Sequence, residues 1–415
     1  MSVTSPPSTA TMEYTVSHVV RSPRLLLRET LAGVITALAL IPEVISFSVI
    51  AGVDPKVSLI ASVVLCLAMS VLGGRPAMVT AAAGSVALVI GPMVSQHGVQ
   101  YILPAVVMAG VIQILFGVLG MARLMRFIPA AVMTGFVNAL GILIFFAQVP
   151  HFWSKSPLIW GLFILTLLIV LWAPRVIKSI PAPLIAIVLL TMFTVTTGQL
   201  LPTVGDEGPM NSSLPGLTLL SVPITWQTLA IIWPCALSIA FVGLMESLLT
   251  AKLVDDLTAT PSNKKRESAG LGIANILAGF YGGIAGCAMI GQTIVNVEMG
   301  KGRSRVSTLT AGVVLLLLVT ALSEVMAKIP MTVLAGIMVI VAVKTFSWRS
   351  LQPATLARLP VTETLVMLTT VAATVCTANL AIGVVAGVIA MLLLPRLARR
   401  KNAAATEAPS PAPEK

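Results

Sequence analysis

The stretch GGIAGCAMIGQTIVNV, residues 282–297, lies in the middle of a strongly apolar chain but is not typical of a membrane-spanning helix. It begins with a glycine-rich run, and glycine disfavours helix by roughly 1 kcal/mol relative to alanine. The apolar run that follows, through Val297, is about half as long as the roughly 20 residues that a spanning helix needs. Irregular backbone at membrane depth is tolerated only where protein covers it or where it lines a cavity. The stretch therefore predicts a binding site built on a short, interrupted helix.

The composition of the whole chain indicates an integral membrane protein. Of its 415 residues, 57% are hydrophobic and only 10% are charged, whereas soluble domains carry about a quarter charged residues. Residues 1–28 are polar, lack the apolar core of a signal peptide, and are expected to form a disordered cytoplasmic tail. The cysteines lie in apolar segments without metal-ligand spacing, so neither disulfides nor a metal cluster is expected. Without a phosphate-binding loop or a hydrolase motif, neither ATP-driven transport nor a membrane enzyme has support.

Apolar segments along the chain predict fourteen membrane spans. They fall at about 30–50, 57–73, 84–95, 101–121, 128–149, 157–173, 181–200, 226–251, 268–281, 287–298, 306–325, 330–345, 362–377 and 379–395. With a cytoplasmic N-terminus and strict alternation, all but three of the 26 Lys and Arg residues lie on the inner side, as the positive-inside rule requires. We therefore expect a multi-pass protein of the plasma (inner) membrane with both termini cytoplasmic. The net charge of +11 follows from this topology and does not indicate a nucleic-acid partner.

The two halves of the chain repeat each other weakly. IPAAVMTG at 128–135 matches IPMTVLAG at 329–336, and the glycine pair at 73–74 precedes an apolar segment as the pair at 282–283 does. Each half holds seven segments, an odd number, so the second half is inverted relative to the first. The expected fold class is an all-α integral membrane protein of 14 transmembrane segments in two inverted 7-helix repeats. Its parts are the first repeat at 29–200, an outer loop at 201–225, the second repeat at 226–395, and a basic, then disordered cytoplasmic tail at 396–415.

Short, interrupted segments at equivalent places in two inverted halves are typical of a transporter binding site at the bilayer midplane. The short helices that begin near Gly84 and Ile290 are predicted to point their N-termini at each other from opposite sides of the membrane. Each N-terminus carries about half a positive charge and unpaired N–H groups. The pair would thus bind an anion without an arginine. The alternative interpretation is that the small residues around Gly84 only permit close helix packing.

Ionisable residues inside apolar segments are costly and usually functional. Glu246, in FVGLMESLLTAK, is the clearest example, and Thr250 lies one helical turn further on the same face. The two are predicted to couple transport to a gradient, either by binding Na⁺ or by protonation of Glu246. The alternative is a structural hydrogen bond from Glu246 to the neighbouring half-helix. Glu43, with Phe47 one turn on, is interpreted either as facing the same cavity or as a packing or gating contact.

These residues resemble the SulP anion permeases over about residues 29–395. The matching pieces are IPEVISFSVIAGVDP (41–55), GGRPAMVTAAAGS (73–85), RFIPAAVMTGFVNALGI (126–142), ESLLTAK (246–252) and the opening stretch. The resemblance implies a core domain of spans 1–4 and 8–11, a gate domain of spans 5–7 and 12–14, and two half-helices that meet at the midplane. Members of this family move inorganic anions or small carboxylates as symporters, exchangers or channels, by an elevator-like motion of core against gate.

The resemblance also implies positions for the substrate and the coupling ion. Carried over residue by residue, the substrate site falls on Glu43, Phe47, Ala83, Gly84, Ser85, Met289, Ile290, Gly291 and Gln292. The coupling-ion position corresponds to Glu246 with Thr250, with Na⁺ as the candidate metal. Three positions depart from relatives: Ala83 replaces a threonine of bicarbonate transporters, Gln292 replaces a common arginine, and Glu246 replaces the aspartate of the sodium-coupled bicarbonate member. Family chains typically continue into a soluble STAS domain; here the sequence ends in a polar tail, and no STAS-based regulation or dimerisation is expected.

Together these features predict a secondary active transporter of a small anion, bicarbonate or sulfate first, driven by a Na⁺ or H⁺ gradient. A nucleobase-type permease of related fold is a weaker alternative, because only Glu246 and Gln292 offer groups that read a base edge. An anion-binding membrane sensor or scaffold without transport is the third hypothesis. No cofactor is expected beyond the coupling Na⁺ or H⁺. The expected partners are a small inorganic or carboxylate anion and membrane lipid, with homodimerisation left open.

Overall fold

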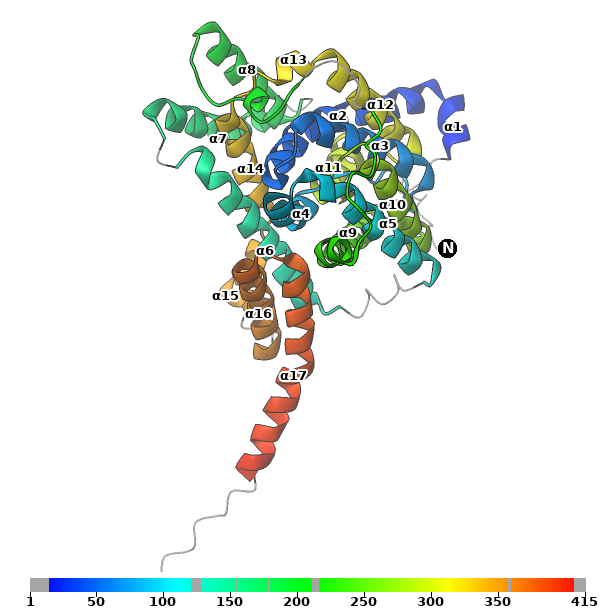
Figure 1. Cartoon of the computed structure of the whole chain (residues 1–415), viewed down its shortest axis with the longest axis vertical. Coiled ribbons are helices and arrows are strands. Elements are labelled where there is room, and N and C mark those ends of the chain that lie inside the picture. The colour runs from blue at the N-terminus through cyan, green and yellow to red at the C-terminus, as the bar shows by residue number, and fades with distance from the viewer. Residues whose placement is uncertain are drawn as a thin grey trace, which may run out of the picture. The chain divides into compact units, whose positions relative to one another are not determined.

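The structure is a computed structural model that describes residues 15–120, 128–153, 155–177, 180–210, 216–356 and 360–406. Within these ranges helix dominates (Figure 1). Six of the described helical segments are long and apolar enough to cross a membrane. They are α2 (Pro23–Ala51), α3 (Pro55–Leu72), η1 with α5 (Val99–Val118), α6 with η3 (Ala130–His151), α7 (Pro157–Val176) and α9 (Trp226–Thr258).

Further helices occupy the other predicted segments. They are α4 (Gly84–His97), α8 (Ala182–Thr196), α10 (Lys264–Gly279), α11 (Ile290–Ile294), α12 (Arg305–Ala321), α14 (Met331–Thr345), α16 (Val361–Thr377) and α17 (Leu380–Thr406). Within the combined segments above, α5 itself is Ile102–Val118 and α6 is Ala130–Gln148. One π-helical turn, η5 (Val295–Met299), extends α11. Small helices connect these elements: α1 (Val16–Arg21), η4 (Val204–Asp206), α13 (Ser323–Met326), η6 (Trp348–Leu351) and α15 (Pro353–Leu356).

Both predicted tails are partly helical. α1 and the first residues of α2 lie within 1–28, where a disordered tail was expected, and residues 1–14 are outside the described ranges. Pro23 is the first residue of α2, where its fixed φ is already that of a helix. α17 continues through Thr406, beyond the expected end at 395, because this segment is rich in leucine, arginine and alanine, which favour helix. Residues 407–415 lie outside the described ranges.

The expected all-α class is wrong in one respect, because the structure contains two short strands. β1 (Thr80–Ala82) and β2 (Gly286–Ala288) pair antiparallel. Neither segment carries the alternating pattern of a half-buried strand, since every residue of both strands is buried. Such fully buried three-residue strands are stabilised by partners distant in sequence, and periodicity gives no sign of them.

The contacts divide the chain into two compact units. The first comprises residues 1–125 and 144–341, and the second comprises residues 126–143 and 342–415. These two units are not the expected core and gate, because α7, α8 and the larger part of α14 cluster with the first unit, and the division into core and gate stays a prediction. One reason for this clustering is that α8 packs against α2, which belongs to the predicted core.

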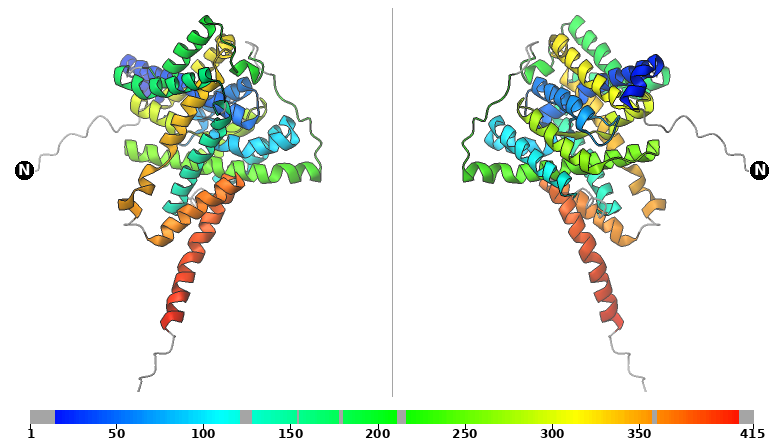
Figure 2. Two further views of the ribbon diagram at one scale, coloured as in Figure 1. Left: turned by 90° about the vertical axis from the view of Figure 1, so that its left-hand side faces the viewer. Right: turned by 90° about the vertical axis from the view of Figure 1, so that its right-hand side faces the viewer.

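Helices of the first unit pack closely where glycine faces a neighbouring backbone. Gly33 of α2 faces α12, and a Cβ at this position would lie 2.6 Å from Thr310 Cβ. Gly272 of α10 faces α5, where an added Cβ would collide with the Gly110 carbonyl oxygen. Small residues at such crossings let helix backbones approach, as is usual in membranes. As a result α2 and α12 lie side by side, and so do α5 and α10 (Figure 1, Figure 2).

The turn that leads from α3 into β1 is held by side chains of the second half of the chain. The Arg305 guanidinium donates to the Gly73 carbonyl at 2.7 Å. The Gly74 N–H donates to the Glu267 carboxylate at 2.7 Å, and Glu267 is completely buried. A Cβ on Gly74 would collide with backbone of the segment before α10. These contacts determine where β1 begins.

Glu29 of α2 is a second completely buried carboxylate, and it joins α2 to the start of α12. It accepts the N–H of Arg303 at 2.8 Å, the N–H of Ser304 at 3.1 Å and the Ser304 hydroxyl at 2.8 Å. We expect Glu29→Ala to lower the thermal unfolding midpoint in detergent, because hydrogen bonds to a charged group contribute about 1.5–3 kcal/mol each. The control is Glu324→Ala, which removes an exposed carboxylate and should leave the midpoint unchanged. Equal midpoints for the two variants would contradict this role of Glu29.

The second unit contains part of α6, the end of α14, η6, α15, α16 and α17, and α16 and α17 pack as neighbours. Gly387 of α17 faces Thr370 of α16, so these two helices approach closely. The buried Asn138 of α6 donates from Nδ2 to the Ser350 hydroxyl at 2.9 Å and accepts the Ser347 N–H at 2.8 Å. This unit contains none of the predicted site residues.

Candidate functional site

The predicted half-helices each follow one strand of a two-stranded ribbon (Thr80–Ala82 and Gly286–Ala288). The register pairs Thr80 with Ala288, Ala81 with Cys287 and Ala82 with Gly286. β1 leads into α4 at Gly84 and β2 leads into α11 at Ile290, so the predicted helix starts are confirmed. Because the strands are antiparallel, the two helices leave opposite ends of the ribbon.

Side chains complete the outer edge of β1. The Ser62 hydroxyl of α3 accepts the Ala82 N–H at 3.1 Å, and the Cys66 thiol donates to the Thr80 carbonyl at 3.1 Å. Unpaired strand edges are not tolerated in hydrocarbon, where no water satisfies them. The polar side chains of α3 therefore take the place of a third strand.

Side chains of α9 complete the outer edge of β2 in the same way. The Ser247 hydroxyl accepts the Ala288 N–H at 2.9 Å, and the Thr250 hydroxyl donates to the Ala288 carbonyl at 3.1 Å. Thr250 also donates to the backbone carbonyl of Glu246, at 2.8 Å. The described contacts of Thr250 thus place its hydroxyl at peptide carbonyls on the edge of the ribbon.

Glu246 lies where the two halves of the chain meet. It is buried in α9, and its Oε2 accepts two hydrogen bonds, one from the Ser85 hydroxyl of α4 and one from the Cys287 thiol of β2 at 3.1 Å. The Ser85 oxygen and the Cys287 sulfur are themselves 3.7 Å apart. The partners of this carboxylate are a hydroxyl and a thiol, one from each half. Charged acceptors strengthen such hydrogen bonds, so the carboxylate ties the ribbon to the first turn of α4.

α2 contributes an aromatic ring beside the start of α4. Phe47 is buried, and a Cβ on Gly84 would lie 2.5 Å from its Cε1. Only glycine therefore allows the ring to reach the first turn of α4. Ala83 precedes that turn in extended conformation and is buried, while Glu43 lies half-buried one turn before Phe47.

The start of α11 holds the other predicted substrate residues. Met289 is buried and its N–H donates to the Val79 carbonyl at 2.9 Å, whereas Ile290 is half-buried. Gly291 is exposed, and a Cβ added there would meet open space. Gln292 is buried; its Nε2 donates to the Ala39 carbonyl of α2 at 3.3 Å, and its Oε1 has no hydrogen-bond partner among the described residues.

Several polar residues of the site were not singled out from the sequence. The sequence marks Cys287 only as a cysteine in an apolar segment, and it predicts no role for the edge residues Ser62, Cys66 and Ser247. It also predicts none for Asn275 of α10, whose Oδ1 accepts the Gly286 N–H of β2 at 2.8 Å. The sequence does carry a signal for these residues, because serine and asparagine within apolar spans are uncommon and usually hydrogen-bond across helices. Which groups they contact depends on packing between segments far apart in the chain.

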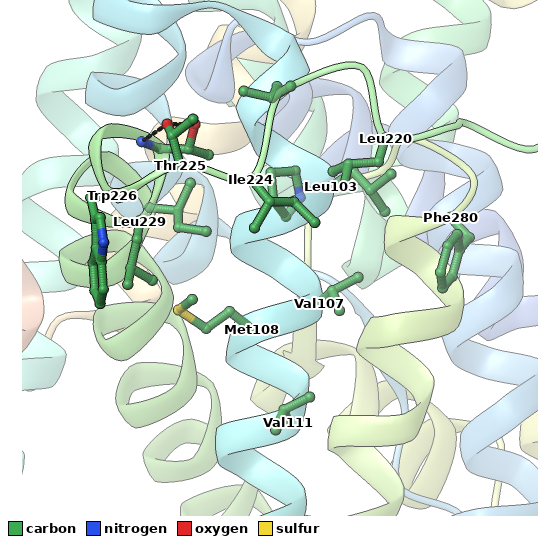
Figure 3. Close-up of a pocket in the computed structure, with 14 residues that line it drawn as sticks. Leu103, Val107, Met108, Val111, Leu220, Ile224, Thr225, Trp226, Leu229 and Phe280 are labelled. Carbon is green, nitrogen blue, oxygen red and sulfur yellow. Dashed lines mark hydrogen bonds between the residues drawn. The ribbon is translucent and has the colours of Figure 1, made fainter.

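A large cavity of the first unit lies elsewhere. A cavity of about 740 Å³ is bounded by α5, α9 and the connecting segment before α9, with Leu103, Met108, Ile224, Trp226 and Phe280 among its lining side chains (Figure 3). The polar groups among its lining side chains are the hydroxyls of Thr225 and Thr228 and the indole N–H of Trp226, and none of these side chains is charged. None of the predicted site residues lines it. An inorganic anion needs charge or N–H donors, so this apolar cavity is not a candidate anion site.

Discontinuous helices that meet at a buried carboxylate, inside a helical membrane protein, define a membrane transporter rather than an enzyme. A profile of the sulfate permease family matches residues 26–156 and 153–370. The chain belongs to this family.

Individual relatives agree with this assignment. A putative sulfate transporter of Bacillus subtilis, YbaR, is 48% identical over 87% of this chain and 75% of its own length. The bicarbonate transporter BicA of Picosynechococcus sp. is 28% identical over 78% of this chain and 62% of its own length. The solved transmembrane domain of a cyanobacterial BicA superposes with a TM-score of 0.77 at 26% identity, covering 88% of this chain and 98% of that domain.

Proposed function

We propose that this chain is a secondary active transporter of a small inorganic anion, with sulfate and bicarbonate as the first substrates to test. The names of its relatives support these two anions. The observation that carries the proposal is the carboxylate of Glu246, which accepts hydrogen bonds from Ser85 of one half and Cys287 of the other. A change in the charge of Glu246 therefore acts on both half-helices at once.

In this proposal Glu246 is the coupling group and H⁺ is the favoured coupling ion. Both described donors converge on Oε2, which leaves Oε1 to carry a proton when the acid is neutral. Sodium is the alternative, with Thr250 as its second oxygen ligand. The Thr250 hydroxyl uses its proton on peptide carbonyls, so its oxygen lone pairs remain available to Na⁺, and the preference for H⁺ rests on the Oε1 atom of Glu246.

The anion is proposed to bind between the two half-helices. The first turn of α4, at Ala83, Gly84 and Ser85, and the first turn of α11, at Met289 to Gln292, each offer backbone N–H groups. Helix N-termini attract anions through these groups and through the helix dipole. Phe47 and Glu43 of α2 bound the same region. Two inverted seven-helix repeats, divided into core and gate, would then alternate the access of this site by an elevator-type motion.

The proposed orientation in the inner membrane has both termini in the cytoplasm. It is supported by the distribution of basic residues, which places all but three Lys and Arg on one side.

The test is uptake of labelled sulfate and labelled bicarbonate into sealed proteoliposomes, with the Na⁺ gradient and the pH gradient varied independently. We expect accumulation of at least one of the two anions, driven by the pH gradient. Accumulation driven only by Na⁺ would assign Na⁺ as the coupling ion. Anion binding without any counterflow would contradict transport and favour a membrane sensor.

A further inference from the structure

Two buried amides, Asn275 in α10 and Gln113 in α5, hold the first residue of β2. Both side chains are completely buried. Asn275 accepts the Gly286 N–H on Oδ1 at 2.8 Å and donates from Nδ2 to the Gly286 carbonyl at 3.2 Å. The same Nδ2 donates to Gln113 Oε1 at 2.9 Å. One side chain therefore pairs with both backbone groups of Gly286, which point away from β1.

Gln113 brings an unpaired donor close to the site. Its Nε2 has no hydrogen-bond partner among the described residues. It lies against Gly243 of α9, one helical turn before Glu246, where an added Cβ would be 3.1 Å from Nε2 and 3.8 Å from Cys287 Cβ. Leaving a buried donor unpaired is unfavourable, and in a natural protein such a group calls for an explanation. An apolar residue of the same length would remove this unpaired donor, but it would leave one Nδ2 proton of Asn275 without its acceptor.

We propose that the Asn275–Gln113 pair is a positioning element of the transport site. Cys287 follows Gly286 directly, and its thiol donates to Glu246 at 3.1 Å. α11 begins three residues after Cys287. By holding Gly286, Asn275 sets the position of the thiol on the carboxylate and of the N-terminus of α11. The inference rests on the proposed function, because it takes Glu246 and the half-helices to be the transport site.

The experiment compares Asn275→Ala with Asn138→Ala. Each variant removes a buried asparagine that makes hydrogen bonds through both Oδ1 and Nδ2, but Asn138 lies in the second unit. KM and Vmax are measured in proteoliposomes with whichever of labelled sulfate or bicarbonate the wild type accumulates, together with thermal unfolding in detergent. We expect both variants to unfold at lower temperature. Only Asn275→Ala should raise KM, by about tenfold, as for the loss of one to two hydrogen bonds.

Gln113→Met provides a graded variant that keeps the bonds between Asn275 and Gly286. We expect it to raise KM by about two- to threefold, since it removes one acceptor of Asn275. If Asn275→Ala does not fold, Gln113→Met alone tests the positioning role. An unchanged KM in Gln113→Met and in any folded Asn275→Ala, with a wild type that transports, would overturn the positioning role alone. A wild type that accumulates neither anion would overturn the proposed function instead.

Discussion

Glu246→Gln is expected to abolish gradient-driven anion uptake while the protein remains folded. Glutamine has the same shape as glutamate, and its carbonyl oxygen still accepts the Ser85 hydroxyl and the Cys287 thiol. The amide, however, neither ionises nor takes up a proton, so the site no longer changes charge. Uptake into proteoliposomes under a pH or Na⁺ gradient should fall to the level of protein-free liposomes. The thermal unfolding midpoint should stay close to that of the wild type.

The matched control for this variant is Glu324→Gln. Glu324 lies in α13 and is exposed, and its replacement should leave both uptake and stability unchanged. Coupled uptake at the wild-type rate in Glu246→Gln would remove Glu246 from the coupling mechanism. A large fall in unfolding temperature would show instead that the carboxylate is mainly structural, which is the alternative that the sequence left open.

Gly286→Ala is expected to prevent stable folding, and Gly291→Ala to be tolerated. A methyl group on Gly286 collides with the Ala81 carbonyl oxygen across the ribbon and lies 2.5 Å from Leu65 Cδ1. Relief of this clash requires the two strands to separate, and overpacking typically costs about 1–3 kcal/mol and more where, as here, the backbone has to move. At Gly291 an added methyl group meets open space. There alanine gains up to about 1 kcal/mol in helix propensity.

The comparison is informative because both glycines belong to the same stretch, 282–297. The measurement is the yield of monodisperse protein after extraction from membranes, followed by thermal unfolding. We expect little folded Gly286→Ala and a normal yield of Gly291→Ala. If the two variants are equally stable, the ribbon does not pack as described. If Gly291→Ala is stable but has a raised KM, Gly291 faces the anion, as the family resemblance implies.

The sequence was sufficient to locate the two half-helices and the buried carboxylate. Both helix starts, at Gly84 and Ile290, follow from glycine-rich runs within apolar segments that are too short to span. Glu246 was recognised because a carboxylate in an apolar span is costly unless it has partners. These signals are local, so they are readable without knowledge of the fold.

The partners of these residues were not predictable in the same way. Glu246 meets Ser85 and Cys287, which are 161 and 41 residues away along the chain. The contacts of the Thr250 hydroxyl with the carbonyls of Glu246 and Ala288 were not predicted, while its service to the coupling ion stays a prediction. The pairing of β1 with β2, and the choice of side chains that hydrogen-bond the outer edges of the ribbon, depend on how α3, α9 and α10 pack around it.

The sequence by itself determined the class of the protein, a mostly helical membrane transporter, because burial in a bilayer demands long apolar helices. Only the tertiary structure showed that the stretch 282–297 contains a strand paired with β1 and which side chains it contacts. In the hydrocarbon region no water is present to hydrogen-bond the backbone, so β1 and β2 pair with each other. Side chains of serine, threonine, cysteine and asparagine hydrogen-bond the backbone groups at their outer edges. That requirement brings Cys287 and Ser85 onto Glu246 and joins the two halves of the chain at one carboxylate.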